Sequence, residues 1–169
     1  MNRITAPPRI RSSGKRARGR LRTGREGGQS LVEFALCLPL LLLVVTGIFT
    51  FSFALNNYLT LTNAVGIGGQ LLAVSRGQTT DPCNTAASAI YGASPLLSQT
   101  AFTFSFVLNG NSYSGASCSS GSTTTGAAGN LVQGANAQVT ATYPCNLMVY
   151  GVNYLPSCKL TSQVTEVVQ

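Results

Sequence analysis

Histidine and tryptophan are absent from this 169-residue chain. Histidine is the commonest general base and the commonest zinc ligand, so its absence argues against most hydrolytic and zinc-dependent chemistry. Acidic residues are scarce too, with four Asp and Glu in all. The two beyond residue 77, Asp81 and Glu166, stand near opposite ends of that region, so a secreted enzyme has little support. We expect no catalytic residues, no metal site and no cofactor.

Positive charge is missing from most of the chain. Nine of the eleven Lys and Arg residues lie within the first 25 positions, and the part after Gly28 carries a formal charge of −1. A basic chain often binds nucleic acid. Here, however, the basic residues border a long apolar run, where positive charge serves to orient a membrane segment. We therefore expect a membrane and no nucleic acid as a partner.

The apolar run extends from Phe34 to Ala54 without a charge. As a helix its 21 residues would be about 31 Å long, which matches the hydrocarbon core of a bilayer. It predicts a single-pass transmembrane helix with a cytoplasmic N-terminus, kinked at Pro39. A secretory signal usually has a shorter apolar core. Because Ser52-Phe53-Ala54 resembles a signal-peptidase site, that alternative stays open.

The helix is expected to continue beyond the apolar run. Tyr58, Leu61, Val65 and Leu72 recur at three- and four-residue intervals, which predicts one apolar stripe of an amphipathic helix. Glycines at 66, 68 and 69 predict a weak or bent end, since glycine disfavours helix. Gly77 is expected to stop the helix, with Arg76 in its last turn.

Residues 77–169 predict a small α+β domain. Asp81-Pro82 is typical of a helix start, and the alternating apolar residues before Asn109-Gly110 are typical of a β-hairpin. The expected elements are a short helix over 84–93, strands over 102–108, 111–114, 136–143 and 160–168, and a surface loop over 115–130. The expected fold is thus a long N-terminal transmembrane helix extending into a small antiparallel sheet domain with helical segments.

Five cysteines are present, and four of them follow the apolar run. Cys37, inside the run, is expected to be an inert small hydrophobe. No pair has the C-x-x-C spacing, so two structural disulfides in an oxidising compartment are preferred over redox or zinc chemistry. We expect Cys145 to pair with Cys158 across a short loop, and Cys83 with Cys118.

Glu33 is a lone carboxylate at the start of the apolar helix, five residues after Gly28. It could simply interact with the helix macrodipole from the first turn. Alternatively, a chain cut after Gly28 would begin at Gln29, with a positive amine four residues before Glu33. Glu33 of one subunit could then pair with that amine of its neighbour in an apolar bundle and fix their register.

This pattern resembles a type IV prepilin signal. The stretch Gly28-Gln29-Ser30-Leu31-Val32-Glu33-Phe34-Ala35-Leu36, then Leu38–Leu42 and Leu59–Ala64, is similar to the TadE-like family of minor pseudopilins of the Tad/Flp pilus system. The resemblance implies a cut between Gly28 and Gln29, with Glu33 and Phe34 in recognition and assembly. It implies three domains: a basic cytoplasmic leader (1–28), a transmembrane and juxtamembrane helix (29–76), and an extracytoplasmic domain (77–169).

The implied function is that of a non-enzymatic assembly component in the bacterial inner membrane. Its partners would be a prepilin peptidase, the inner-membrane pilus assembly platform and other pilins. The alternative is an uncleaved, membrane-anchored extracytoplasmic binding or adhesion domain. The mature N-terminus distinguishes the two, because Gln29 supports the pseudopilin and Met1 supports the anchor.

Overall fold

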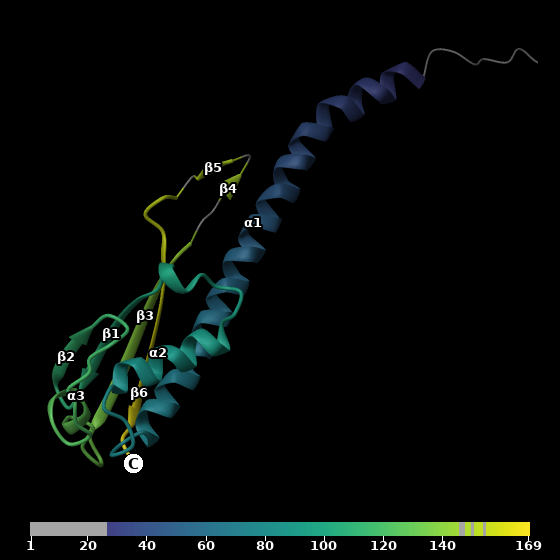
Figure 1. Ribbon diagram of the computed structural model, residues 1–169. Helices are drawn as coiled ribbons and strands as arrows, with labels where there is room; N and C mark the ends of the chain where they lie inside the picture. Colours follow the sequence, from purple (N-terminus) through teal and green to yellow (C-terminus); the bar gives the residue numbers. More distant parts are fainter. Residues whose placement is uncertain (1–26, 146–147, 150, 154) are drawn as a thin grey trace, which may run out of the picture. The chain divides into compact units, whose positions relative to one another are not determined.

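The computed structural model describes residues 27–145, 148–149, 151–153 and 155–169 (Figure 1). Residues 1–26, which make up nearly all of the predicted basic leader, lie outside this range. The chain divides by its contacts into Met1–Leu41 and Leu42–Gln169. Its elements are α1 (Gly27–Val74), α2 (Pro82–Ala93), η1 (Gln99–Ala101), β1 (Thr103–Leu108), β2 (Asn111–Ser114), α3 (Gly126–Gly129), β3 (Asn136–Pro144), β4 (Met148–Val149), β5 (Val152–Asn153) and β6 (Lys159–Val167). The expected fold class is confirmed.

Helix α1 has 48 residues, and Glu33 is its only charged residue. Hydroxyl side chains within it donate to carbonyls one turn earlier: Thr46 to Leu42 at 2.7 Å and Ser52 to Ile48 at 2.8 Å. These hydroxyls therefore require no water. Pro39 lies inside the helix, and the kink expected there stays a prediction.

The end of α1 differs from the expectation. The helix stops at Val74, so Arg76 lies beyond it rather than in its last turn. The cause is Ser75, whose backbone N–H and hydroxyl both donate to the Leu72 carbonyl, at 3.2 and 2.8 Å. A serine that bonds the backbone in this way competes with helical hydrogen bonding. Gly77 then turns the chain with a φ of +70°, a value that favours glycine.

Four antiparallel strands form the main sheet, in the order β2-β1-β3-β6. The predicted hairpin is present, with β1 paired to β2 across Asn109-Gly110. Both turn residues have positive φ, 47° and 82°, as a tight hairpin turn requires. Strand β3 pairs with β6 from Asn136↔Val167 to Pro144↔Lys159, which confirms the pairing of the final strand.

One face of this sheet forms the core with α1 and α2. The sheet contributes alternate residues of β1 and β3, and the helices contribute the predicted stripe together with Ile90; the main members are Phe104, Phe106, Leu108, Ala137, Val139, Ala141, Leu61, Val65 and Leu72. Tyr58 was predicted in the same stripe but is 41% exposed. Tyr58 lies N-terminal to the part of α1 that packs against the sheet.

Aromatic rings fix α2 on the sheet. The Tyr91 ring of α2 meets Phe102 and Phe104 edge-on, each at a centroid distance of 5.6 Å. Phe102 lies 5.2 Å from Tyr143, and the Tyr143 hydroxyl accepts a hydrogen bond from Ser98 N–H. Edge-to-face contacts of this kind stabilise a core by about 0.5–1.5 kcal/mol each beyond area burial.

The glycines of α1 have a packing role that the sequence pattern did not reveal. A Cβ at Gly68 would collide with the side chain of Ile90 in α2, and one at Gly69 would collide with Val164 in β6. Glycine therefore lets the helix backbone approach both elements closely. The helix continues through these residues, because packing outweighs the intrinsic penalty of about 1 kcal/mol per glycine.

Two disulfides cross-link the region 77–169. They join the pairs that the sequence favours, Cys83 to Cys118 and Cys145 to Cys158. The second closes the segment that contains β4 and β5, a small hairpin that the sequence did not predict. Short helix α3 was likewise missed, within the loop expected over 115–130.

Asp81 caps α2 as predicted and also holds the loop around Cys118. Its Oδ1 accepts from the N–H groups of Asn84 and Cys118, both at 2.9 Å, and its Oδ2 accepts from the Ser117 hydroxyl. Burial raises the pKa of this carboxyl, but the hydrogen bonds from Ser117, Cys118 and Asn84 outweigh it and leave the pKa below its ordinary value. The charged form is therefore the one that the fold stabilises.

We expect Gly68→Ala to lower the free energy of unfolding by about 1–3 kcal/mol, because the new methyl group overpacks the contact with Ile90. Gly66→Ala is the matched control, since a Cβ at Gly66 meets nothing within 4 Å among the described residues. It should stabilise the helix by about 1 kcal/mol. Urea unfolding of the detergent-solubilised protein measures both. Equal effects of the two substitutions would contradict the close approach.

We expect Asp81→Asn to destabilise the protein at neutral pH by about 1 kcal/mol, because asparagine can still cap the helix but its amide nitrogen cannot accept the Ser117 hydrogen bond that the charged Oδ2 accepts. Because the folded-state pKa of Asp81 is lowered, its contribution is fully present above the unfolded value of about 3.9 and is lost as pH falls through the folded value. The stability difference between wild type and variant should therefore shrink below about pH 4. A difference that stays constant down to pH 2 would refute this role.

Candidate assembly interface

The predicted processing and assembly residues lie in the first two turns of α1. Gly28 and Gln29 are in the first turn, and Glu33 and Phe34 are in the second. Gln29 and Glu33 are four residues apart, a spacing that puts both on one side of a helix. Gly28, Glu33 and Phe34 are exposed.

This placement weakens the simpler interpretation of Glu33. That interpretation put the carboxylate in the first helical turn, where the macrodipole attracts it. The helix begins at Gly27, and its first turn contains no acidic residue. The macrodipole acts mainly within the first turn, so it gives little reason for a carboxylate at position 33.

Among the described residues, one helix is long and apolar enough to span a membrane. The candidate span is Ser30–Val74, and its most apolar window has a mean hydropathy of 2.5 with no part buried inside the protein. A helix that is apolar all round and uncovered by its own chain requires an apolar environment.

The outer half of α1 carries a second apolar face. Residues on the side opposite the sheet remain between 42% and 59% exposed: Leu55, Leu59, Ile67, Leu71 and Val74. The polar residues among them, Thr62, Asn63 and Gln70, have no charge. We call this set the outer face of α1. The helical faces of soluble domains that contact water usually carry charges, so this one is suited to contact with another apolar surface.

The periodicity of the sequence predicts the buried stripe of α1 but not the outer face. The signal that could have revealed it is the lack of any charge from Phe34 to Ser75, which extends well past the 21 residues that a bilayer needs. An amphipathic helix in water would have placed Lys or Glu on this side.

The exposed face of the sheet is mostly polar, and Lys159 at the start of β6 is the one charged residue among its described strand positions. Its side chains form cross-strand rows, such as Thr103, Thr142 and Thr161, which pair in register. The Thr142 and Thr161 hydroxyls are 3.3 Å apart, and Gln138 donates to Thr165 at 3.4 Å. A surface made mostly of hydroxyl and amide groups can hydrogen-bond a polar partner.

Two further places in the fold bring polar groups or a cavity together. Asp81, Cys83 and Cys118 offer ligand atoms within 4.8 Å of one another, but both sulfurs form a disulfide and only the carboxylate remains. A pocket of about 390 Å³ lies beyond the end of α1, with lining residues that include Arg76, Thr124 and Leu131. Arg76 donates to Gln133 Oε1 at 3.4 Å. None of the residues predicted for processing or assembly lines this pocket.

One comparison with known proteins bears on this interface. The family model described as TadE-like protein matches residues 28–69. The match confirms the resemblance seen in the sequence. It covers Gly28, Gln29, Glu33 and Phe34, and continues along α1 to Gly69. No curated protein and no solved structure matches the chain.

The similarity to TadE-like proteins is confined to the N-terminal helix. The family indicates a membrane protein related to the Tad pilus, and it is generally structural rather than enzymatic. The region after Gly69 lies outside the match, so its fold is known from the structure alone.

Proposed function

We propose that this chain is a minor pseudopilin-like component required for assembly of Tad/Flp-type pili, anchored by α1 in the bacterial inner membrane. The observation that carries the proposal is the outer face of α1, which extends the apolar surface of the span beyond the bilayer. A single-pass anchor that acts alone needs no such extension. A helix that packs against other subunits on leaving the membrane does need one.

The proposed orientation follows from the basic leader. Its positive residues remain on the cytoplasmic side, so residues 77–169 lie outside. The two disulfides support an extracytoplasmic location, because such bonds persist in oxidising compartments.

Processing would follow insertion. A prepilin peptidase would cut between Gly28 and Gln29, removing nearly all basic charge and creating an α-amine four residues before Glu33. The Glu33 carboxylate would pair with the new amine of a neighbouring subunit, in an apolar environment where an unpaired charge is costly. Phe34 would contribute to recognition at the same helix end.

The alternative function is an uncleaved, membrane-anchored binding or adhesion domain. The exposed face of the sheet, which is rich in Thr, Ser and Gln, favours it, because such a surface can contact a polar partner. A binding or adhesion function does not, however, explain the apolar outer face of α1. The two proposals differ in the mature N-terminus, which would be Gln29 for the pseudopilin and Met1 for the anchor.

We expect N-terminal sequencing of the membrane-extracted protein to find Gln29, and Gly28→Ala to slow the cut because the residue before the scissile bond must fit the peptidase. Glu33→Gln should be cleaved but should reduce pilus assembly at least tenfold, since it removes the negative partner of the α-amine and keeps the shape. Immunoblotting and pilus counts measure both effects. A Met1 N-terminus in wild-type membranes would reject the pseudopilin, and normal piliation by Glu33→Gln would reject the charge pairing.

We expect Ile67→Lys to abolish assembly while leaving the domain folded, because a charge on the outer face of α1 cannot be buried against a neighbour. Ser88→Lys is the matched control, since Ser88 is an exposed residue on α2 away from this face. Intact disulfides in both variants would show that each one folds. Copurification with pilus components distinguishes the two variants. The proposal predicts that only Ile67→Lys loses this copurification.

A further inference from the structure

We propose that copies of this chain associate side by side by strand addition, the free edge of β6 in one copy pairing antiparallel with the free edge of β2 in the next. The inference rests on the proposed anchoring of α1, which gives all copies one orientation in the membrane. It adds a second contact between subunits, made by the sheet rather than by the outer face of α1.

The first free edge belongs to β6, which stands last in the sheet order and pairs with β3 on one side. At one end of this ladder, Cys145 N–H donates to the Cys158 carbonyl at 3.1 Å. At the other end, Val168 N–H donates to the Ala135 carbonyl at 3.0 Å. Bonding toward the partner alternates along an antiparallel strand, so the even-numbered residues of β6 bond β3. The backbone groups of the odd-numbered residues therefore point outward: Thr161, Gln163 and Thr165.

The outward groups of β6 are open. Among the described residues, none of them has a hydrogen-bond partner. The helices cover this strand only in part, since Leu160 and Val164 on its core side are half-buried while Val139 of β3 is fully buried. Helix α1 takes an outward N–H just beyond the strand, where the Ala73 carbonyl accepts from Gln169.

The middle of β6 also lacks the features that usually protect an edge strand from pairing with another chain. Such features are mid-strand charges, prolines and bulges. The two charged residues of β6, Lys159 and Glu166, lie toward its ends, and the residues between them include no proline. Its register with β3 is unbroken from Lys159 to Val167.

Strand β2 provides the second free edge. Gly115 N–H donates to the Phe104 carbonyl at 3.1 Å, so Gly115 and the alternate residues before it bond β1. The outward residues of β2 are therefore Ser112 and Ser114, and both are exposed. Their outward backbone groups have no hydrogen-bond partner among the described residues.

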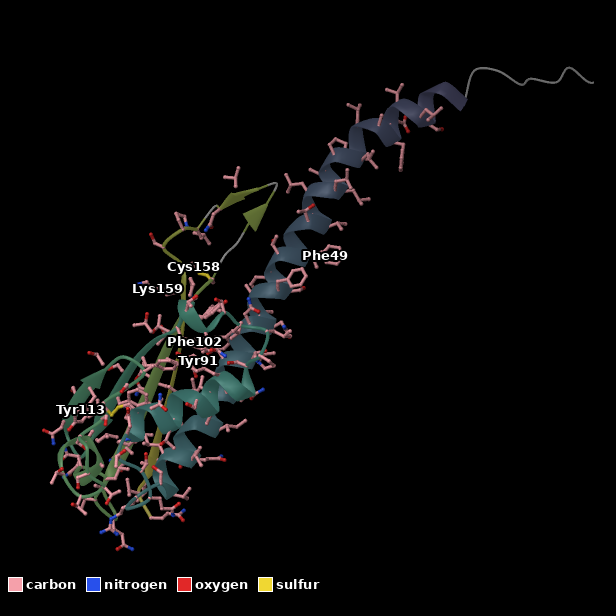
Figure 2. The ribbon with its side chains drawn as sticks, viewed as in Figure 1. Phe49, Tyr91, Phe102, Tyr113, Cys158 and Lys159 are labelled. Atoms are coloured by element: carbon pink, nitrogen blue, oxygen red, sulfur yellow. A yellow bond between two sulfur atoms is a disulfide. The ribbon has the colours of Figure 1, made fainter. Side chains whose placement is uncertain are left out.

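The two edges match in direction. The strands alternate in direction along β2-β1-β3-β6, so β2 and β6 run antiparallel to each other. Figure 2 labels Tyr113 on β2 and Lys159 at the start of β6, one on each edge of the sheet. A copy placed alongside in the same orientation therefore presents its β2 antiparallel to the β6 of the first copy.

The two edges match in face as well. Ser114 lies opposite Ser105 of β1, whose side chain is exposed, so the outward residues of β2 carry their side chains on the exposed face. Gln163 of β6 is exposed on the same face. The sheet would thus continue from one copy to the next with its polar face on one side.

The membrane anchor selects this pairing over a symmetric dimer. Antiparallel pairing of two β6 edges requires a half-turn about an axis perpendicular to the sheet. Because α1 packs along the core face of the sheet, such a half-turn would reverse the direction of α1 in one copy. Two chains with basic leaders on the same side of one membrane exclude that arrangement. Head-to-tail pairing keeps every α1 in the same direction and, because it is heterologous, can repeat.

A second copy is favoured over an unrelated strand because the chain itself carries both halves of the contact. Neither 112–114 nor 161–165 contains a charge, so the pairing buries no ion. The side chains that would meet on the exposed face are hydroxyls and an amide, which can hydrogen-bond across neighbouring strands.

Cysteine cross-linking of the full chain in membranes tests the contact. Replacing Cys37 by Ala removes the free thiol. In that background Ser114→Cys would be combined, in one chain, with each of three changes on β6: Thr161→Cys, Gln163→Cys and Thr165→Cys. We expect at least one combination to form dimers and higher multimers on mild oxidation, because each copy carries both halves. A combination counts only if both native disulfides form.

Two controls separate strand pairing from mere proximity. Ser105→Cys in place of Ser114→Cys lies in the same row, one strand farther from the edge, and should cross-link at least tenfold less. Ser112→Pro removes an outward N–H and leaves the bonds of β2 to β1, so it should lower the cross-linked fraction at least fivefold. Ser112→Ala keeps that N–H and should change the fraction little.

The possible results separate this inference from the proposed function. If no combination cross-links above the Ser105→Cys control, the pairing is overturned and the pseudopilin proposal stands. Cross-linking by Gln163→Cys alone would show that two β6 edges meet, and cross-linking that Ser112→Pro leaves unchanged would show contact without strand pairing; each overturns the inference. The expected pattern in a chain that keeps Met1 would support the pairing and reject the pseudopilin.

Discussion

The close contact of α1 with α2 and β6 at Gly68 and Gly69 is the constraint on which the rest of the structure depends. It determines which side of α1 enters the core, and therefore which side stays outside as the apolar outer face. It also places Val164 of β6 against Gly69 of the helix. A methyl group at Gly68 would collide with Ile90 of α2, and one at Gly69 would collide with Val164 of β6.

Helix α1, whose only charged residue is Glu33, thus has surfaces suited to three environments. Toward its N-terminal end its whole circumference is apolar, which suits lipid. Farther out, one side packs on the sheet while the other keeps enough Leu, Ile and Val to suit another protein surface. The family match likewise continues beyond Ala54, to Gly69.

Much of the fold could be predicted from local signals. Asp81-Pro82 predicted the start of α2, Asn109-Gly110 predicted the β1–β2 turn, and the apolar run predicted the span. The packing of Gly68 and Gly69 could not be predicted, because it depends on Ile90 and Val164, which are distant in sequence. The outer face of α1 was missed for a related reason: periodicity identifies one buried stripe, but it does not show that the opposite side also lacks charge. The roles of Gly28, Gln29, Glu33 and Phe34 stay predictions, since they concern a cleaved and assembled chain.

The scarcity of charge in the outer region has a colloidal consequence. Residues 76–169 contain Arg76, Lys159, Asp81 and Glu166, and their formal charges cancel. Neighbouring copies therefore have almost no long-range repulsion to overcome, so they can crowd at high density on a membrane surface. Dissolved salt should therefore change the electrostatic interaction between neighbouring copies very little, because few charges are present to be screened. Such a domain would present nearly the same surface to its neighbours in fresh water and in brine.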